Sequence, residues 1–431
     1  MKKHKLPFFL FTSLLCHHSY FSHLSDLVHF ETHKLEAYDA FPSSYISYIP
    51  TLVLPFTPFT LYYHLLYSRT MKNIMPLENI PDWEKRLARQ DAFWDCENDD
   101  RPVVFMQVPK KKRIMSYPDA TKFKSIRERW FDPQFHAENA LAFVSNTDFL
   151  CDALPNVWPN LGPDLFCAFL GSELEFAETT SWSSPILDDY ANGDKLHFSE
   201  NNFYYRKLNE ITDALLEAGK GKFYVGYTDF HPGGDAIAAL RGPEKLNFDL
   251  IENPDAVKSF RKRIDRIYFY TIDLMYNRLR NAGQPCATWC NIVSSKKWTI
   301  ACNDFSCMIS KKMFDDIFLP GIIEECRFFE KSIYHLDGTG ALQHLDSILS
   351  IKELNAIQWV PGEGHGRASD WMHIYKRIQK AGKGMQISLD LDEIDFFMEN
   401  LQPNGLWIGI YGVKDMETAK EIIKKIEKWH A

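Results

Sequence analysis

The chain reads Ser332-Ile333-Tyr334-His335-Leu336-Asp337-Gly338-Thr339-Gly340, a β-prone run that opens into a glycine-rich turn. In an extended segment residues i and i+2 share a face, so His335 and Asp337 are predicted to project together from the end of a strand. Strand ends followed by loops are where parallel α/β proteins carry their chemistry. The alternative is a polar strand terminus at which Asp337 only caps the turn.

Short apolar runs in the C-terminal half predict strands, and helical patterns separate most of them. They are Lys222–Tyr227, Cys286–Cys290, Ser332–His335, Ala356–Val360, Met385–Leu389 and Leu406–Ile410. Val103–Val108 predicts a further strand, and one more is expected at an unplaced position between residues 140 and 200. Repeating strand–helix units imply a parallel sheet. We therefore predict an α/β fold, a single (β/α)8 barrel of the TIM type, with a doubly wound open sheet as the alternative.

Helices are predicted where apolar residues recur at helical spacing. One runs from Trp83 to Phe93, and a long one begins at the capping pair Asn253 and Pro254. Two more begin at Ser369 and near Asp415.

Composition narrows the class of protein. With 431 residues, 45% hydrophobic and 25% charged, the chain is long enough for one large barrel or two ordinary domains. A net charge of −8 argues against nucleic-acid binding, which needs a basic surface. The nine cysteines form no Cys-x-x-Cys pair, which favours reduced thiols and a cytoplasmic location over a disulfide scaffold.

Residues 1–70 differ from the rest, because they contain no glycine or tryptophan and carry little charge. Pro50, Pro55 and Pro58 interrupt their second apolar run, which makes it a poor membrane helix. Three interpretations compete: a signal or anchor, a disordered extension, and upstream sequence joined to a true start at Met71 or Met75. We favour the last, with residues 71–431 as the barrel and no membrane segment in it.

In a barrel, the residues that follow each strand share one mouth. These residues are Asp229, His231, Trp289, Asp304, His335, Asp337, Glu363, His365, Asp390 and Tyr411. Two imidazole–carboxylate pairs stand out among them, His335-x-Asp337 and Glu363-x-His365, on neighbouring predicted strands.

Each pair has two chemical interpretations. A carboxylate can orient an imidazole and raise its basicity, which produces a general acid or base near neutral pH. Alternatively, His335, Asp337, Glu363 and His365 can hold a divalent metal such as zinc with open positions. A purely structural network is the third interpretation.

Several segments resemble the uroporphyrinogen decarboxylase superfamily over residues 80–430. They are Asn303-Asp304-Phe305-Ser306 running to Phe314 and Leu319-Pro320, Tyr334-His335-Leu336-Asp337-Gly338, Ile357 to Gly364, and Leu240-Arg241-Gly242-Pro243-Glu244. Asp100-Arg101-Pro102-Val103-Val104 is similar to the opening strand of the methyltransferase branch. The resemblance implies a (β/α)8 barrel with its site at the C-terminal mouth.

The superfamily contains cofactor-free decarboxylases of tetrapyrrole acetate groups, and zinc enzymes that move methyl groups between corrinoid proteins and thiols such as coenzyme M. This chain lacks the arginine-rich loop with which the decarboxylases bind substrate carboxylates. Arg86 and Arg89 are the nearest equivalents, and two arginines replace that loop poorly. The methyltransferases use a His-x-Cys pair and a distant Cys on zinc. His335 matches their histidine, but Asp337 stands in place of the first cysteine, and no cysteine follows Cys326. A zinc–thiolate site of that form is therefore excluded, while one with oxygen and nitrogen ligands is not.

The resemblance favours an enzyme of the methyltransferase-like branch with an altered site. We expect catalysis by His335 and Asp337, with Asp304 and Glu363 orienting the reacting group. Trp289 and Trp359 are expected to form apolar walls, and Asp229, His231, Arg101 and Tyr411 to contact substrate. A corrinoid presented by a partner protein and a zinc-like metal are the expected cofactors. A decarboxylase (carboxy-lyase) of a tetrapyrrole or smaller acid, and an inactive ligand-binding barrel, are the alternatives; the oligomeric state, homodimer included, is open.

Overall fold

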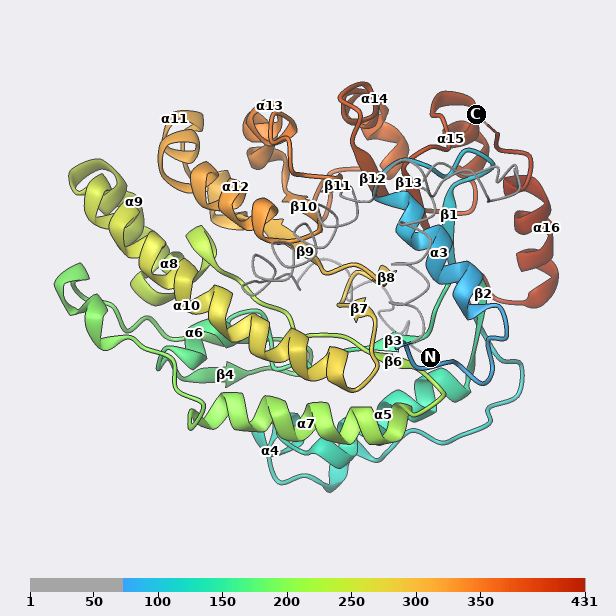
Figure 1. The fold of residues 1–431 in the computed structure, drawn as a ribbon, viewed down its shortest axis with the longest axis horizontal. Helices are drawn as coiled ribbons and strands as arrows, with labels where there is room; N and C mark the ends of the chain where they lie inside the picture. Colours follow the sequence, from blue (N-terminus) through green and yellow to red (C-terminus); the bar gives the residue numbers. More distant parts are fainter. Residues whose placement is uncertain (1–72, 431) are drawn as a thin grey trace, which may run out of the picture.

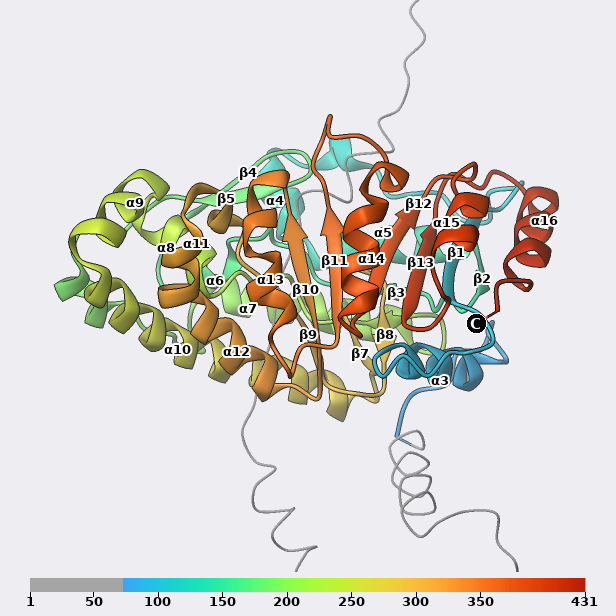
Figure 2. The ribbon, with the colours of Figure 1, turned by 90° about the horizontal axis from the view of Figure 1, so that it is seen from above.

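The computed structural model describes residues 73–430, and the predictions made for residues 1–70 lie outside them. A seven-stranded sheet forms the centre of the molecule, with strand order β2-β1-β13-β12-β11-β10-β9 (Figures 1 and 2). Its strands are β1 (Val103–Pro109), β2 (Thr147–Cys151), β9 (Trp298–Cys302), β10 (Lys331–Asp337), β11 (Ala356–Val360), β12 (Gly384–Leu389) and β13 (Leu406–Ile410). The β1–β2 pair is antiparallel, and the other pairs in this sheet are parallel.

The predicted parallel α/β architecture is confirmed, and in Figure 1 the helices form an outer layer around the strands, as in a TIM-like barrel. Closure into an eight-stranded barrel stays a prediction, because the seven-stranded ladder of the described residues ends at β2 on one side and at β9 on the other. Short strand pairs complete the described β structure. They are β3 (Asn156–Val157) with β6 (Tyr224–Val225), β4 (Leu174–Phe176) with β5 (Ser181–Ser183), and β7 (Cys286–Ala287) with β8 (Val293–Ser294).

The C-terminal half follows the predicted strand–helix repeat. β11 and β13 coincide with the predicted runs, and all five residues of β13 are buried, as expected for a strand covered on both faces. The elements that follow β10 to β13 are η6 (Thr339–His344), α13 (Leu345–Leu349), η7 (Ala368–Trp371), α14 (Met372–Lys380), α15 (Ile394–Asn400) and α16 (Met416–Ile426). α16 begins where Asp415 accepts hydrogen bonds from the backbone N–H groups of Glu417 and Thr418.

The middle of the chain forms a further group of helices. They are α8 (Gly233–Arg241), α9 (Pro243–Glu252), α10 (Pro254–Asn281), η4 (Asp304–Met308), α11 (Lys311–Met313), the π-helical turn η5 (Phe314–Phe318) and α12 (Leu319–Phe328). α10 begins with Pro254 at its first turn, as predicted. It ends at Asn281. Gly283, two residues later, has a φ of 72°, a backbone conformation that residues other than glycine rarely adopt.

The strand β9 was missed by the sequence analysis. All five of its residues, Trp298 to Cys302, are buried. Only two of them, Trp298 and Ile300, are large and apolar, so the sequence shows no continuous apolar run there. Between residues 140 and 200, where one unplaced strand was expected, β2 pairs antiparallel with β1, and β3 pairs in parallel with β6.

The first helix, α3 (Trp83–Phe93), matches its predicted bounds and leads into a segment that covers the N-terminal ends of the strands. Lys331 at the start of β10 contacts Asp95 at 2.5 Å, and the Asn355 side chain donates to the Trp94 carbonyl oxygen at 3.2 Å. The N–H group of Gly405, just before β13, donates to Asn98 at 2.9 Å. This covered edge leaves the C-terminal strand ends for chemistry.

The remaining elements of the N-terminal half lie along the opposite rim from α12 to α15 (Figure 1). They are η2 (Ala120–Lys122), α4 (Ile126–Trp130), α5 (Pro133–Ser145), α6 (Leu165–Phe169), η3 (Tyr190–Lys195) and α7 (Phe203–Gly219). No helix within residues 73–430 is long and apolar enough to cross a membrane.

Candidate functional site

His335 lies near the C-terminal end of β10, between two parallel neighbours. In the register of the sheet it pairs with Cys302 of β9 on one side and with Gln358 of β11 on the other. Paired residues of parallel strands point to the same face, so these three side chains and Asp337, two residues further on, are brought to one edge. The prediction that His335 and Asp337 project together from a strand end is consistent with this register.

A chain of amide groups fixes the orientation of the His335 ring. Gln386 donates to the backbone carbonyl of Cys290 at 2.6 Å, and Gln358 donates to the Gln386 side-chain oxygen at 2.6 Å. The remaining Gln358 oxygen contacts Nδ1 of His335. Because the Cys290 carbonyl oxygen can only accept, it fixes which end of each amide group donates and which accepts. The Gln358 oxygen is therefore an acceptor, and Nδ1 of His335 must carry the proton. Nε2 of His335 therefore keeps its lone pair for a proton or a metal.

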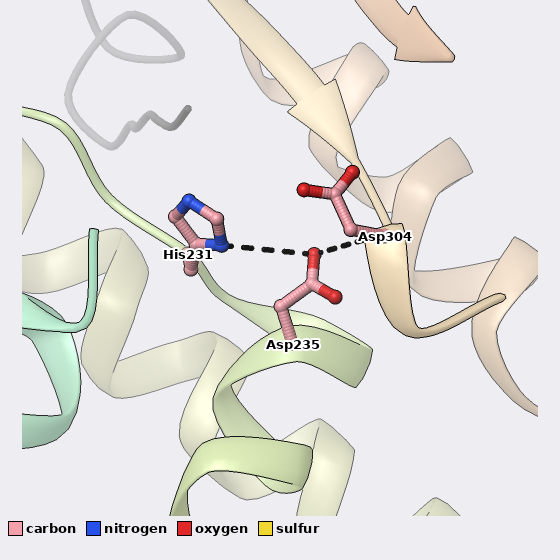
Figure 3. A group of neighbouring side chains, drawn as sticks. All are labelled: His231, Asp235 and Asp304. Carbon is pink, nitrogen blue, oxygen red and sulfur yellow. Dashed lines mark hydrogen bonds and ion pairs between the residues drawn. The ribbon is translucent and has the colours of Figure 1, made fainter. Parts of the chain in front are cut away.

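Asp304 lies two residues after the end of β9, at the start of η4. It is shared by two groups of potential ligands. One consists of Asp304, His335 and Asp337, and the other of His231, Asp235 and Asp304 (Figure 3). In each group the donor atoms lie within 4.8 Å of one another. The thiol of Cys302 is also close, with Sγ 3.1 Å from Oδ1 of Asp304 and 3.3 Å from Oδ2 of Asp235.

Asp235 was not found by the sequence analysis. It lies in the first turn of α8, and it accepts hydrogen bonds from the N–H groups of Asp304 at 3.0 Å and Phe305 at 2.8 Å. A Cβ atom on Gly234 would lie 2.4 Å from Oδ1 of Asn303, so this approach of α8 to the end of β9 requires glycine. The Gly233-Gly234-Asp235 sequence was the available signal, since paired glycines at a helix start permit such close contact.

The charges at this edge act on one another. Burial and the carboxylates of Asp235 and Asp337 hold the pKa of Asp304 well above its usual value. Burial also lowers the pKa of His335, although Asp337 and Gln358 act in the opposite direction. The raised pKa of Asp304 reflects crowded carboxylates, beside which a positive ion would be stabilised, whereas the lowered pKa of His335 reflects burial, which favours the neutral ring.

Glu363 and His365 are not brought into either group. Both lie exposed in the loop after β11, where Nδ1 of His365 contacts the backbone oxygen of Glu363 at 3.1 Å. Gly362, Gly364 and Gly366 alternate with them at positive φ, which shapes the loop into successive turns. The expected catalytic role of Glu363 and the metal ligation by Glu363 and His365 stay predictions.

The two tryptophans predicted to form apolar walls lie on different sides of the strands. Trp289 packs edge-on against His335, with ring centroids 5.6 Å apart and an interplanar angle of 86°. Trp359 pairs in register with Leu336 and packs against Trp371, 5.1 Å away, in the outer layer of helices. Because neighbouring residues of a strand point to opposite faces, Trp359 cannot share the face of Gln358. Only Trp289 is placed as a wall of the site.

Arg101 is at the opposite end of the sheet from the site. It precedes β1, and Val103 pairs with Trp407 at the start of β13. Its guanidinium group forms a two-bond ion pair with Asp152, at 2.5 and 2.9 Å. The expectation that Arg101 contacts substrate stays a prediction, and this position argues against it, because a residue before a strand lies at its N-terminal end.

The other predicted substrate contacts lie towards the C-terminal edge. Tyr411 follows β13, and its side chain hydrogen-bonds to Asn291 and Ser388. His231 lies 3.9 Å from Asp235. Asp229 is fully buried, and within the described residues neither of its carboxyl oxygens has a hydrogen-bond partner. Burial, with Asp304 nearby, holds the pKa of Asp229 well above its usual value.

The fold and this edge define an α/β protein with a mostly parallel, TIM-like sheet and histidine and carboxylate side chains at the C-terminal strand ends. No protein-family model matches the chain, and no curated protein matches it. Among solved structures, it is similar to a methyltransferase from Methanosarcina mazei, with a TM-score of 0.51 and 12% sequence identity. The match covers 80% of this chain and 99% of that chain. At this identity the similarity establishes a shared fold.

Proposed function

We propose that this chain is an enzyme of the methyltransferase branch of the uroporphyrinogen decarboxylase superfamily. In this proposal a methyl group passes between a corrinoid, presented by a partner protein, and a small acceptor molecule. The similarity in fold to a methyltransferase supports it. The observation that carries it is the group of Asp304, His335 and Asp337 at the C-terminal strand ends, where His335 matches the metal-binding histidine of that branch.

The donor set of this group fits a divalent metal. It offers one imidazole nitrogen and two carboxylates within 4.8 Å of one another, and zinc accepts nitrogen and oxygen ligands of these types. The Gln358 contact supports the fit, because a metal-binding histidine usually donates its other ring N–H to a fixed acceptor. When bound, such a metal would act as a Lewis acid that lowers the pKa of the acceptor.

The side chains have separate roles in this proposal. An acceptor that takes a methyl group must lose its proton to solvent, because Asp304 and Asp337 are occupied as metal ligands together with His335. Gln358 holds the ring of His335 in one tautomer. Trp289 covers one edge of that ring and excludes water from it. The carboxylates around Asp304 disfavour the decarboxylase alternative, because a tetrapyrrole substrate with several carboxylates would be repelled.

The proposal is tested with the purified chain, methylcobalamin, zinc and a panel of acceptors that includes thiols. We expect the cobalt absorbance to change as the methyl group leaves, and His335→Ala to slow this change by about 10²-fold or more. His197→Ala, at an exposed histidine far along the chain, is the control and should transfer at the wild-type rate. No change in absorbance with the wild-type protein and any acceptor would exclude methyl transfer and leave the ligand-binding alternative.

A further inference from the structure

The second group around Asp304 combines three kinds of donor atom. Oδ2 of Asp235 lies 3.3 Å from Sγ of Cys302 and 3.9 Å from Nδ1 of His231. Sγ of Cys302 lies 3.1 Å from Oδ1 of Asp304. Figure 3 shows one carboxyl oxygen of Asp235 between the His231 ring and the backbone N–H group of Asp304, with a contact to each. Sulfur, nitrogen and oxygen donors therefore converge on one small volume.

These four side chains are held by separate parts of the fold. Cys302 ends β9, Asp304 begins η4, Asp235 belongs to the first turn of α8, and His231 lies in the loop before that helix. The backbone N–H groups of Asp304 and Phe305 fix the carboxylate of Asp235. Cys302, Asp235 and His231 are buried. Fixed ligands from several rigid elements, with hydrogen bonds behind them, are a property of metal sites.

The spacing of the donor atoms agrees with zinc coordination. A tetrahedral centre with Zn–S near 2.3 Å and Zn–O near 2.0 Å places sulfur and oxygen ligands about 3.5 Å apart. The two sulfur–oxygen distances, 3.1 and 3.3 Å, need only a few tenths of an ångström of expansion. Both carboxylates and the thiol would bind the metal in their deprotonated forms.

We propose that His231, Asp235, Cys302 and Asp304 form a site for a zinc-like divalent metal, with Cys302 as its thiolate ligand. The site is distinct from the group of His335 and Asp337 and shares Asp304 with it. It rests on the contacts between these four side chains and not on methyl transfer. Asp337 replaces a cysteine of the related zinc enzymes, and here β9, the neighbouring strand, supplies a sulfur ligand instead.

Cobalt(II) provides a direct test, because a cobalt–thiolate bond gives an intense near-ultraviolet charge-transfer absorption that oxygen and nitrogen ligands do not give. The metal-free full chain is titrated with cobalt(II) alone. We expect the wild-type protein to develop this absorption and Cys302→Ser to lose it. Cys286→Ser is the matched control: Cys286 is equally buried, on β7, and its thiol donates to the Trp298 carbonyl. That variant should keep the absorption.

Two further variants separate ligation from folding and locate the site. His231→Ala should retain the absorption but need about tenfold more cobalt, whereas His335→Ala should leave it unchanged. Far-ultraviolet circular dichroism checks that Cys302→Ser is folded, and zinc should displace the cobalt from the wild-type protein. No charge-transfer absorption in the wild type, or the same absorption in Cys302→Ser, would overturn the proposal, as would its loss in His335→Ala. The assay contains no corrinoid, so a protein that binds cobalt through sulfur but transfers no methyl group contradicts only the proposed function.

Discussion

Gln358 and Trp359 are consecutive residues of β11 that point to opposite faces of the strand. Gln358 contacts His335 inside the sheet, and Trp359 packs against Trp371 outside it. Sequence proximity to the site therefore does not place Trp359 in it. Substitutions on the Gln358 face of β11 are therefore expected to change metal binding, and substitutions on the Trp359 face to change stability.

The first prediction compares Trp289→Leu with Trp359→Leu. Trp359 is 4% exposed, so shortening it should lower the free energy of unfolding by about 2–3 kcal/mol without changing metal affinity. Trp289→Leu should weaken metal binding, because its ring covers His335. Urea unfolding and zinc titration of both variants measure the two effects. A change of zinc affinity in Trp359→Leu would contradict the outward position.

Gln358→Leu should weaken metal binding at His335 by about 10- to 100-fold, the usual effect of removing the partner that orients a metal-binding histidine. The ring would lose the acceptor that holds its proton on Nδ1. Zinc competition titration measures the affinity. Gln134→Leu, at an exposed position on α5, is the control and should bind zinc as the wild type does. Equal affinities in the two variants would mean that the amide chain does not support the histidine.

Arg101→Ala should reduce stability and leave the site intact. Asp152 is 4% exposed and would lose its two-bond partner, although Arg89 still lies 3.6 Å from it. We expect a loss of about 1–3 kcal/mol in the free energy of unfolding. Urea unfolding gives this number, and zinc affinity should be unchanged. Loss of affinity in a folded variant would return Arg101 to the site.

Asp337→Cys recreates a His-x-Cys pair on β10. The variant should bind cadmium and zinc more tightly than the wild type, because thiolate is the softer ligand. Removing one carboxylate should also lower the pKa of Asp304, which Asp337 helps to raise. Cadmium titration followed by thiolate absorption tests this prediction, with Asp346→Cys as the exposed control. Unchanged cadmium affinity would show that position 337 does not face the metal.

Stability should depend on pH through the buried pair of Arg261 and Asp265, whose side chains lie 2.5 Å apart. Burial raises the pKa of Asp265 to about 7 from its usual 3.8, against the effect of Arg261. The folded state therefore keeps this proton over a pH range in which the unfolded state has lost it. The resulting stabilisation is complete below pH 3.8 and is lost as the pH rises to about 7.

The measurement is the free energy of unfolding of the wild type and of Asp265→Asn between pH 4 and 8. Because asparagine does not titrate, the wild type should lose stability relative to the variant as the pH rises through this range. A difference that stays constant, or that grows in favour of the wild type, would contradict the raised pKa.

The sequence predicted the parts of the fold that depend on local pattern. Ala356–Val360 and Leu406–Ile410 are strands because they are short apolar runs between helical segments, and both were located correctly. The strand β9 was not, because Thr299, Ala301 and Cys302 leave only two large apolar residues in Trp298–Cys302, so no continuous apolar run marks it. Its position determines where Cys302 points, so the thiol beside Asp304 was missed with it.

The site was predicted in part for a similar reason. His335, Asp337 and Asp304 follow neighbouring strands and were expected at one edge, where the structure groups them. Asp235 approaches from a helix about 70 residues earlier, and the alignment of Gln358 with Gln386 depends on the register of β11 and β12. Neither relationship is encoded by residue spacing. Glu363 and His365 were expected there from their spacing, but both lie exposed in a loop whose alternating glycines have positive φ.

The amide chain from Cys290 to His335 has a consequence for how this site can change. Its last acceptor is a backbone carbonyl, which every amino acid possesses, so no substitution at position 290 reverses the direction of the chain. Replacing Gln358 or Gln386 can break this series of hydrogen bonds but cannot reverse its donor-to-acceptor direction. A lineage in which Nε2, and not Nδ1, carried the proton would need a shifted strand alignment. The tautomer of His335 is thus determined by the register of β10, β11 and β12, and less by the identity of any single side chain.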